Sequence, residues 1–491
     1  MTTLTTEQYH RAAGVLLGQA CGDALGVPYE FSTPPDGEPR MLGGGLGPYA
    51  PGEWSDDTQM AVCVAEVAAT GADLTALDAL DPIAGRFLDW VSGGASDVGI
   101  QTRIILDRTA QSGEPGAARM LLEARNHYLQ TGRAAGNGAL MRTAVVGLTR
   151  LGDRAATAAA ARTVAELTHA DPLAGDSCVI WSELVRRAVV DDALEPHATL
   201  DLLPPERRSQ WAHLLDEATD GRHPRDLGAN GFTVTALQAA LAGVTRGMLE
   251  SDRAGAFRVG LSTAVQAGDD TDTVAAIAGG LLGALCGVSA VPFEWRRAVH
   301  GWPGLRARDL VGLALRTATG DSLPGRGWPL APSMALGDEP PMAVPHPADP
   351  DVLLGTVADI AGVEQLGVRA VVSLSRVGTA DVPDVIAPED HHEVWLLDDE
   401  RPSANPLLEF VLDDAAAAVA AYRAEGKRVL VHCVAAQQRT PSVAVRYAVR
   451  LGHTPDAAAR AVQSALPSAR GSGRLWRVAT RPADSSSTAE G

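Results

Sequence analysis

Lysine is almost missing from this 491-residue sequence, in which Lys427 is the single example. Lysine and arginine together number 41 against 60 aspartate and glutamate residues, so the formal net charge is −19. A protein that binds nucleic acid needs a basic face for the phosphates, and this balance argues against a general nucleic-acid binder. The same acidic excess is compatible with carboxylates gathered around a cation.

Cysteine and long apolar runs are also scarce. The five cysteines are scattered without a CxxC pair, and four lie in apolar, helix-like surroundings. This usage predicts a reduced chain in the cytoplasm. Residues 1–14 lack the basic-then-apolar pattern of a signal peptide. No apolar run reaches the roughly 18–20 residues that span a bilayer, so no membrane-spanning helix is expected.

Apolar spacing divides the chain into two parts. Its length exceeds one ordinary core, so at least two domains are expected. From residue 6 onward apolar residues recur at helical spacing, which predicts one all-α domain over residues 1–330. The predicted helices span residues 8–25, 57–70, 73–91, 115–130, 153–167, 174–191, 230–249, 255–266, 272–287 and 307–317.

A second part follows a proline-rich stretch, residues 331–350, which is expected to form a linker. Short valine- and leucine-rich runs then alternate with helical stretches and predict a small α/β domain over residues 351–480. The predicted strands are 352–356, 370–374, 394–397 and 428–432, and the predicted helices are 357–366, 407–424, 440–451 and 455–466. The polar tail, residues 481–491, is expected to be disordered.

Two acidic clusters stand out in the first part. They read EWSDDTQM over residues 53–60 and GDDTDT over residues 268–273, each at the start of a predicted helix. Helix capping explains one such residue per cluster, but adjacent carboxylates repel unless a cation neutralises them. Oxygen ligands without His or Cys suit Mg²⁺, Mn²⁺ or Ca²⁺ rather than Zn²⁺. Metal binding and capping with solvation therefore both remain as explanations.

Five motifs, the two clusters included, occur in a fixed order along the chain. They are GQACGDALGVPYE at 18–30, WSDDTQM at 54–60, GNGALMR at 136–142, THADP at 168–172 and GDDTDT at 268–273. This ordered set resembles the ADP-ribosylglycohydrolase family, which includes the dinitrogenase reductase-activating glycohydrolase. The resemblance covers residue 8 to about residue 320.

The resemblance implies an all-α fold that holds two Mg²⁺ ions, or Mn²⁺ in their place. The implied metal ligands are Ser55, Asp56, Asp57, Asp270, Asp272 and Thr273. Ser55 stands where threonine is more usual, and it keeps the hydroxyl ligand. Glu30 matches the family's acidic residue beside the metal centre, although alone it would be interpreted as a surface residue. The implied partner is an ADP-ribosylated protein or a related ADP-ribose conjugate.

The residue types fit cleavage of the glycosidic bond at C1″ through an oxocarbenium-like transition state. Paired cations orient ribose hydroxyls and lower the pKa of a bound water. Glu30 then positions that water or a ribose hydroxyl, or acts as a base. The glycine loop suits close approach to a diphosphate or ribose, and His169 either contacts the ligand or satisfies polar groups of the core. The loop residues expected to bind substrate are Gly136, Asn137, Gly138, Ala139 and Met141.

A third feature, HCVAAQQRT over residues 432–440, lies between a predicted strand and a predicted helix. It resembles the signature of the cysteine-based protein phosphatases, especially the small dual-specificity type. The resemblance implies Cys433 as a thiolate nucleophile stabilised by loop N–H groups and the helix N-terminus. Arg439 would clamp two phosphate oxygens, and Thr440 would hydrogen-bond the thiolate. The alternative for Cys433, a small buried apolar residue, does not explain Arg439.

The phosphatase resemblance also requires a general acid upstream of the loop. Asp398 is the preferred candidate, with Asp399 next, while a solvated turn is the alternative for both. Ala436 stands where glycine is common, so the loop is expected to be slightly widened or forced out of the left-handed conformation.

The sequence thus predicts a two-domain, metal-dependent hydrolase that releases ADP-ribose through a binuclear Mg²⁺ centre and carries a phosphatase-like second domain. A phosphorylated substrate is a second predicted partner. The alternative is a cysteine-dependent phosphatase, or a scaffold, whose first domain only binds ADP-ribose. The side chain or other acceptor that carries the ADP-ribose is left open.

Overall fold

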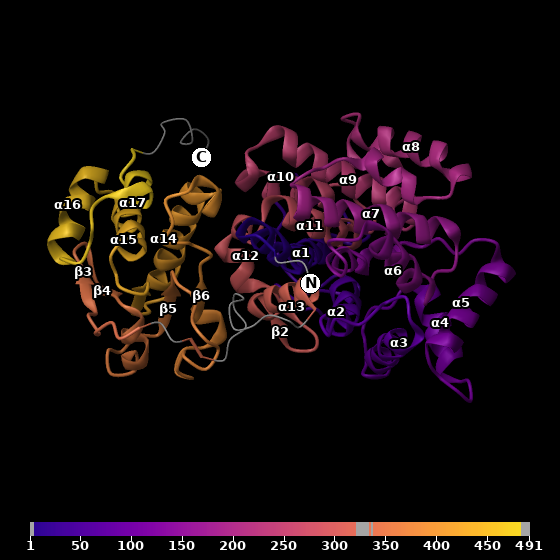
Figure 1. The fold of residues 1–491 in the computed structure, drawn as a ribbon, viewed down its shortest axis with the longest axis horizontal. Coiled ribbons are helices and arrows are strands. Elements are labelled where there is room, and N and C mark those ends of the chain that lie inside the picture. Colours follow the sequence, from indigo (N-terminus) through magenta and orange to yellow (C-terminus); the bar gives the residue numbers. More distant parts are fainter. Residues whose placement is uncertain (1–3, 321–332, 335–336, 483–491) are drawn as a thin grey trace. The chain divides into compact units, whose positions relative to one another are not determined.

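The computed structural model describes residues 4–320, 333–334 and 337–482 (Figure 1). Two compact units make up the chain, one of Met1–Val291 with Ala298–Pro324 and the other of Pro292–Arg297 with Gly325–Gly491. None of the described helices combines the length and apolarity that a bilayer crossing needs. All five cysteines are buried, and none of them forms a disulfide.

The first unit is built from helices, apart from the two-residue strands β1 (His300–Gly301) and β2 (Leu305–Arg306), which pair antiparallel. Its α-helices are α1 (Thr6–Gly26), α2 (Asp56–Ala68), α3 (Leu77–Ser92), α4 (Ile100–Ala110), α5 (Ala117–Thr131), α6 (Arg154–Glu166), α7 (Pro172–Asp191), α8 (Pro205–Thr219), α9 (Thr233–Glu250), α10 (Arg253–Val265), α11 (Thr271–Cys286) and α13 (Ala307–Thr319). The prediction of an all-α first domain is confirmed.

Two of these helices, α4 and α8, were not predicted. In α4 two of the buried side chains, Thr102 and Thr109, are polar. The helix α8 buries Trp211, Leu215 and Ala218 within a segment that is otherwise rich in charged residues. Apolar periodicity is therefore weak in both, because their burial depends on single side chains and hydroxyls rather than on a continuous apolar stripe.

Helices α1 and α11 lie against each other in the middle of the first unit (Figure 1). The contact is made by a glycine seam, which we define as Gly14, Gly18, Gly22 and Gly26 of α1, one glycine per turn facing α11. A Cβ atom added at Gly22 would lie 2.0 Å from the carbonyl oxygen of Ala275, so the two backbones touch directly. At Gly26 the added atom would lie 2.3 Å from Cα of Asp272. The seam thus brings the acidic start of α11 against the end of α1.

The second unit contains a five-stranded sheet in the order β3-β4-β7-β5-β6. Strand β3 pairs antiparallel with β4, and the other pairs are parallel. The strands are β3 (Val344–His346), β4 (Asp349–Gly355), β5 (Ala370–Ser373), β6 (His391–Glu393) and β7 (Val429–His432), and the helices are α12 (Phe293–Ala298), α14 (Leu408–Ala424), α15 (Arg439–Arg450), α16 (Pro455–Ala465) and α17 (Gly473–Ala479).

The sheet separates two apolar cores, and helices α14–α17 gather on one of its faces (Figure 1). On the central strand β7, Val429 and Val431 join the core beneath these helices, whereas Leu430 joins the smaller core on the other face. Both faces of β7 are therefore buried, as expected for a central parallel strand.

Three predictions for the second unit differ from the structure. The helix expected over 357–366 is a shorter 3-10 helix, η7 (Val357–Gly362). The strand predicted over 394–397 is wrong in position, because β6 covers His391–Glu393 and the apolar run after it is buried without forming a strand. The last part of the predicted linker, residues 344–350, forms β3 and the start of β4. Other parts of the predicted linker and tail, residues 331–332, 335–336 and 483–491, lie outside the described residues.

Candidate active sites

An acidic centre forms in the first unit where the starts of α2 and α11 meet the end of α1. We use this name for seven carboxyl-bearing residues, which influence one another electrostatically: Asp23, Glu30, Asp56, Asp57, Asp97, Asp270 and Asp272. The sequence had predicted five of the seven.

Helix capping does not explain the two acidic clusters. Ser55 and Asp270 occupy the N-cap positions of α2 and α11, but neither side chain makes a capping hydrogen bond. The start of α2 is instead satisfied by Asp23, whose Oδ1 accepts hydrogen bonds from the backbone N–H and the hydroxyl of Ser55, both at 2.8 Å. Its Oδ2 accepts from the N–H of Thr58 at 2.9 Å. The carboxylates of the clusters are thereby left for another partner.

The carboxylates form two overlapping groups that fit cations. Oxygen atoms of Asp23, Asp57 and Asp272 lie within 4.8 Å of one another, and so do oxygen atoms of Glu30, Asp270 and Asp272. Asp272 belongs to both groups. The Oδ1 atom of Asp57 is buried without a hydrogen-bond partner. An all-oxygen set with an orphaned buried carboxylate oxygen matches the ligand preference of Mg²⁺ or Mn²⁺.

The electrostatics of the centre point the same way. Burial raises the pKa of Glu30 to about 8, helped by the charges of Asp97 and Asp270. Burial and neighbouring carboxylates also hold the pKa values of Asp57 and Asp272 well above the usual range. So many carboxyl groups cannot all be ionised at neutral pH without a counter-charge, which a bound cation supplies.

Amide and hydroxyl groups fix the carboxylates in place. Asn137 donates from Nδ2 to Asp270 Oδ2 at 2.7 Å and to the carbonyl of Asn230 at 3.0 Å. Asn230 in turn accepts the N–H of Asp270 at its Oδ1, 3.0 Å away. The hydroxyl oxygen of Ser55 lies 2.8 Å from Asp23 Oδ1 and 3.0 Å from Asp57 Oδ2. The glycine loop is thus tied directly to the second acidic cluster through Asn137.

Sequence reasoning missed Asp23 and Asp97. Asp23 lies inside the first motif, and its signal was a charged side chain within the buried stretch of α1. Asp97 lies in the loop between α3 and α4 outside every motif, yet its charge raises the pKa values of Glu30 and Asp56. Burial, together with Asp270, raises the pKa of Asp97 itself. No local pattern could have found Asp97, because only the fold brings it to the centre.

The glycine loop, η2 (Asn137–Arg142) with Gly136 before it, packs on a buried histidine. A Cβ atom at Gly136 would lie 3.3 Å from Nε2 of His169, and one at Gly138 would lie 3.2 Å from its Cε1. Two side chains predicted to bind substrate, Ala139 and Met141, are buried at 1% and 4% exposure. The glycines and Asn137 are half-buried, so this part of the loop is the part that a ligand can approach.

In the second unit, Cys433 follows directly after the central strand β7, and Arg439 begins α15. Open α/β sheets place ligand sites at the carboxyl ends of their strands, which is where this loop lies. The carbonyl groups of Ala436 and Gln437 accept hydrogen bonds from Ser468 Oγ at 3.1 Å and from the N–H of Arg470 at 3.0 Å. These two contacts hold the loop as an arc around Cys433.

Cationic and hydroxyl side chains follow this loop at the start of α15. Arg439 donates from Nη1 to the carbonyl of Leu374 at 2.8 Å, while its Nε is buried without a partner. The hydroxyl of Thr440 is also buried without a partner. Burial, and to a smaller extent the charge of Arg439, lowers the pKa of Arg376, a residue that the sequence did not single out. Unused donors beside two guanidinium groups suit a phosphate anion.

The two predicted acid candidates differ in their surroundings. Asp399 forms a two-oxygen ion pair with Arg401, which lowers the pKa of Asp399 to about 2. Asp398 is exposed and follows Leu397, whose N–H and carbonyl are both bound by the side chain of Asn405. Asn405 therefore fixes the backbone that carries Asp398, and Asp399 is engaged elsewhere.

Comparison with known proteins decides the family of the chain. Residues 4–325 match the family model of the ADP-ribosylglycohydrolases. The chain belongs to the ADP-ribosylglycohydrolase family. It is 32% identical over 301 residues to the ADP-ribosylarginine hydrolase Tri1 of Pseudomonas putida (strain GB-1), a match that covers 60% of this chain and 75% of that protein. It is 28% identical over 298 residues to the ADP-ribosyl-(dinitrogen reductase) glycohydrolase of Rhodospirillum rubrum, covering 58% of this chain and 89% of that protein.

The sheet and helices of the second unit from β3 onward lie beyond the matched residues. The crystal structure of human DUSP28 is similar to this part at 24% identity and a TM-score of 0.24, covering 29% of this chain and 94% of that one. The predicted family of the first unit is confirmed, as is the predicted order of a glycohydrolase domain followed by a small α/β domain.

His169 of the glycohydrolase unit gives a test of acid stability. Burial lowers its pKa to about 3. Arg142 donates to Thr168 Oγ1 at 2.7 Å, and the Thr168 hydroxyl is hydrogen-bonded to Nδ1 of His169 at 2.8 Å. The low pKa makes the ring neutral at pH 7. Its unfolded pKa is about 6.5, so its contribution to stability is present above that pH and is lost as pH falls. We expect wild type to lose about 2 kcal/mol more than His169→Gln between about pH 7 and about pH 5.

Urea unfolding of both proteins at the two pH values measures this difference. Equal losses of unfolding free energy in wild type and His169→Gln would show that the ring is protonated in the folded state, against the low pKa of His169.

Ala436 keeps the left-handed conformation that glycine would adopt, with φ of 51°. The expectation that alanine forces the loop out of this conformation is therefore wrong. Left-handed backbone costs a non-glycine residue about 1–2 kcal/mol, while the fully buried methyl group returns about 0.8 kcal/mol. These opposing terms are of similar size, which explains how the arc around Cys433 tolerates alanine.

Proposed function

We propose that the chain is a cytoplasmic, metal-dependent hydrolase that releases ADP-ribose from ADP-ribosylated proteins through two Mg²⁺ ions, with Mn²⁺ as a substitute. The observation that carries the proposal is the two sets of three carboxylates that share Asp272, together with the buried Asp57 oxygen that has no hydrogen-bond partner. The proposed ligands are Ser55, Asp56, Asp57, Asp270, Asp272 and Thr273.

Bound ions would polarise ribose oxygens and make a water more acidic. Glu30, whose carboxylate lies within 4.8 Å of Asp270 and Asp272 oxygens, would position that water or a ribose hydroxyl. Asn137 would hold Asp270 in its orientation while Gly136 and Gly138 admit the ligand close to the backbone. In this proposal His169 packs against Gly136 and Gly138 and supports the glycine loop.

The charge of the centre favours arginine as the acceptor side chain. Two divalent ions cannot neutralise seven carboxyl groups, so the site retains negative charge toward the leaving group. Asp97 is half-buried at this centre and offers a carboxylate to a guanidinium. One relative is itself an ADP-ribosylarginine hydrolase.

The test is release of free ADP-ribose from matched ADP-ribosyl-arginine and ADP-ribosyl-serine peptides with Mg²⁺ present. We expect at least a tenfold faster release from arginine, corresponding to about 1.4 kcal/mol of transition-state preference, and loss of the activity with a chelator. Faster release from serine would contradict the acceptor assignment. No release from either peptide would contradict the hydrolase and leave the ADP-ribose-binding scaffold.

A second activity is supported by the loop after β7. We infer that the second unit hydrolyses phosphate monoesters, with Cys433 attacking phosphorus as the ester P–O bond breaks and Asp398 giving its proton to the leaving oxygen. Arg439 would bind two phosphate oxygens. The Thr440 hydroxyl, which has no other partner, would donate a hydrogen bond to the Cys433 sulfur when it leaves phosphorus as a thiolate. Water then breaks the S–P bond and releases phosphate. The orphaned Arg439 Nε and Thr440 Oγ1 support this assignment.

A further inference from the structure

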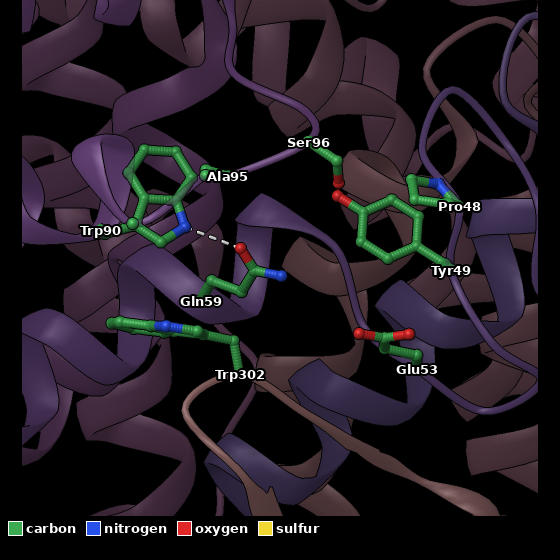
Figure 2. Close-up of a pocket in the computed structure, with 10 residues that line it drawn as sticks. Pro48, Tyr49, Glu53, Gln59, Trp90, Ala95, Ser96 and Trp302 are labelled. Carbon is green, nitrogen blue, oxygen red and sulfur yellow. Dashed lines mark hydrogen bonds between the residues drawn. The ribbon is translucent and has the colours of Figure 1, made fainter.

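A cavity of about 170 Å³ lies in the glycohydrolase unit outside the carboxylate groups described above. The lining side chains that matter for its chemistry are Tyr49, Glu53, Gln59, Trp90, Ser96 and Trp302 (Figure 2). They come from the loop before α2, from α2 itself, from the end of α3 with the loop after it, and from the turn between β1 and β2.

The cavity borders the acidic centre. Gln59 lies one turn after Asp56 on α2, and Ser96 is the neighbour of Asp97 in the chain. Burial raises the pKa of the Tyr49 phenol, and the charges of Asp56 and Asp97 raise it further. A group bound in the cavity would therefore lie next to the centre where the acceptor side chain is cleaved.

Two polar groups of the cavity bind to protein partners, and one carboxylate supplies its charge. Trp90 Nε1 donates to Gln59 Oε1 at 2.6 Å, the dashed contact in Figure 2, and the Gln59 amide nitrogen donates to the Trp54 carbonyl at 3.3 Å. These two donors are thus occupied, whereas the buried Tyr49 hydroxyl has no hydrogen-bond partner. Among the ten described residues that line the cavity, Glu53 alone carries a charge, and it is half-buried.

Aromatic faces complete the site. Figure 2 shows the Glu53 carboxylate and the Tyr49 ring on one side of the hollow and the flat indole of Trp302 below Gln59. Trp302 is 36% exposed, so its side of the cavity is open to an entering group. A carboxylate with tryptophan and tyrosine faces is the combination that binds ammonium and guanidinium groups.

We propose that this cavity binds a basic side chain, lysine or arginine, that neighbours the ADP-ribosylated residue in the acceptor protein. The inference rests on the proposed hydrolase function and adds a sequence preference to it. The negative charge around the cavity favours a cation over a neutral or anionic flank.

The test compares ADP-ribosyl-arginine peptides that carry either lysine or glutamine at the flanking positions. For wild type we expect kcat/KM to be about tenfold higher with the basic flank. A tenfold ratio corresponds to about 1.4 kcal/mol, the scale of a desolvated cation–π contact beside a carboxylate. In Glu53→Gln, which keeps an oxygen to accept the Ala50 N–H, the preference should fall below about twofold. Trp302→Leu should also reduce it, whereas Trp302→Phe retains an aromatic face and should keep most of it.

Free ADP-ribosyl-arginine, which has no flank, controls for damage to the catalytic centre and should be cleaved equally by wild type and Glu53→Gln. Equal wild-type kcat/KM values for the lysine and glutamine flanks would overturn the cavity assignment and leave the hydrolase proposal standing. If no substrate is cleaved, the hydrolase proposal fails. Binding of a cation in the cavity is then tested separately, by titration with methylguanidinium followed by tryptophan fluorescence. Binding that weakens in Glu53→Gln supports it, and binding that does not weaken, or is absent, overturns it.

Discussion

Asp56→Asn combined with Asp57→Asn is expected to lower the rate of ADP-ribose release by about 10³-fold or more, the scale on which loss of metal-supplied charge stabilisation acts. Asp57 belongs to one carboxylate group and has the orphaned oxygen. Removing both charges leaves the buried oxygens without the anionic character that Mg²⁺ requires. Chromatographic detection of free ADP-ribose measures the effect.

Asp78→Asn is the matched control, because Asp78 is the second residue of α3 as Asp57 is the second residue of α2. Asp78 is exposed, so its loss should cost at most about 1 kcal/mol of dipole stabilisation and leave release unchanged.

A thermal measurement reports on the metal independently of catalysis. Without metal the double variant should unfold at a higher temperature than wild type, because burial and repulsion between carboxylates burden the wild-type centre. Mg²⁺ should raise the unfolding temperature of wild type and not that of the variant. An equal rise in both would contradict the assigned ligands.

Cys433→Ser is expected to abolish hydrolysis of an aryl phosphate, a loss of at least about 10³-fold, because a serine hydroxyl is far less ionised than a thiol at neutral pH. The oxygen is smaller than sulfur, so the buried loop should still fold around it. Cys286→Ser provides the control, since Cys286 is another buried thiol but lies in α11 of the first unit. Unchanged phosphate release by Cys433→Ser would remove Cys433 from the mechanism.

The ordered motifs made much of the acidic centre predictable. The starts of α2 and α11 lie at the two clusters, and Glu30, Asp57, Asp270 and Asp272 come together as the resemblance implied. Sequence reasoning treated capping as a rival explanation because it considered each cluster alone. The structure resolves this through Asp23, which caps α2 from another helix 32 residues earlier in the chain.

The remaining misses share a physical cause. Asp97 carries no local pattern, and its position follows from the path of a loop. The strand expected over 394–397 was inferred from apolar residues, which report burial rather than hydrogen-bonded pairing. By contrast, the glycines at residues 14, 18, 22 and 26 were a readable signal of close helix packing, and their spacing could have pointed to Asp23.

The glycine seam between α1 and α11 has a consequence for the size of ion that the centre accepts. Mg²⁺ binds oxygen at about 2.0–2.1 Å and Ca²⁺ at about 2.3–2.6 Å, usually with more ligands. A larger ion needs the carboxylates around Asp272 to spread, yet Asp272 lies on α11, whose backbone touches that of α1 at Gly22 and Gly26. Moving α11 away from α1 would lose this close packing, so we expect the centre to adjust by side-chain rotation and to favour the smaller ion.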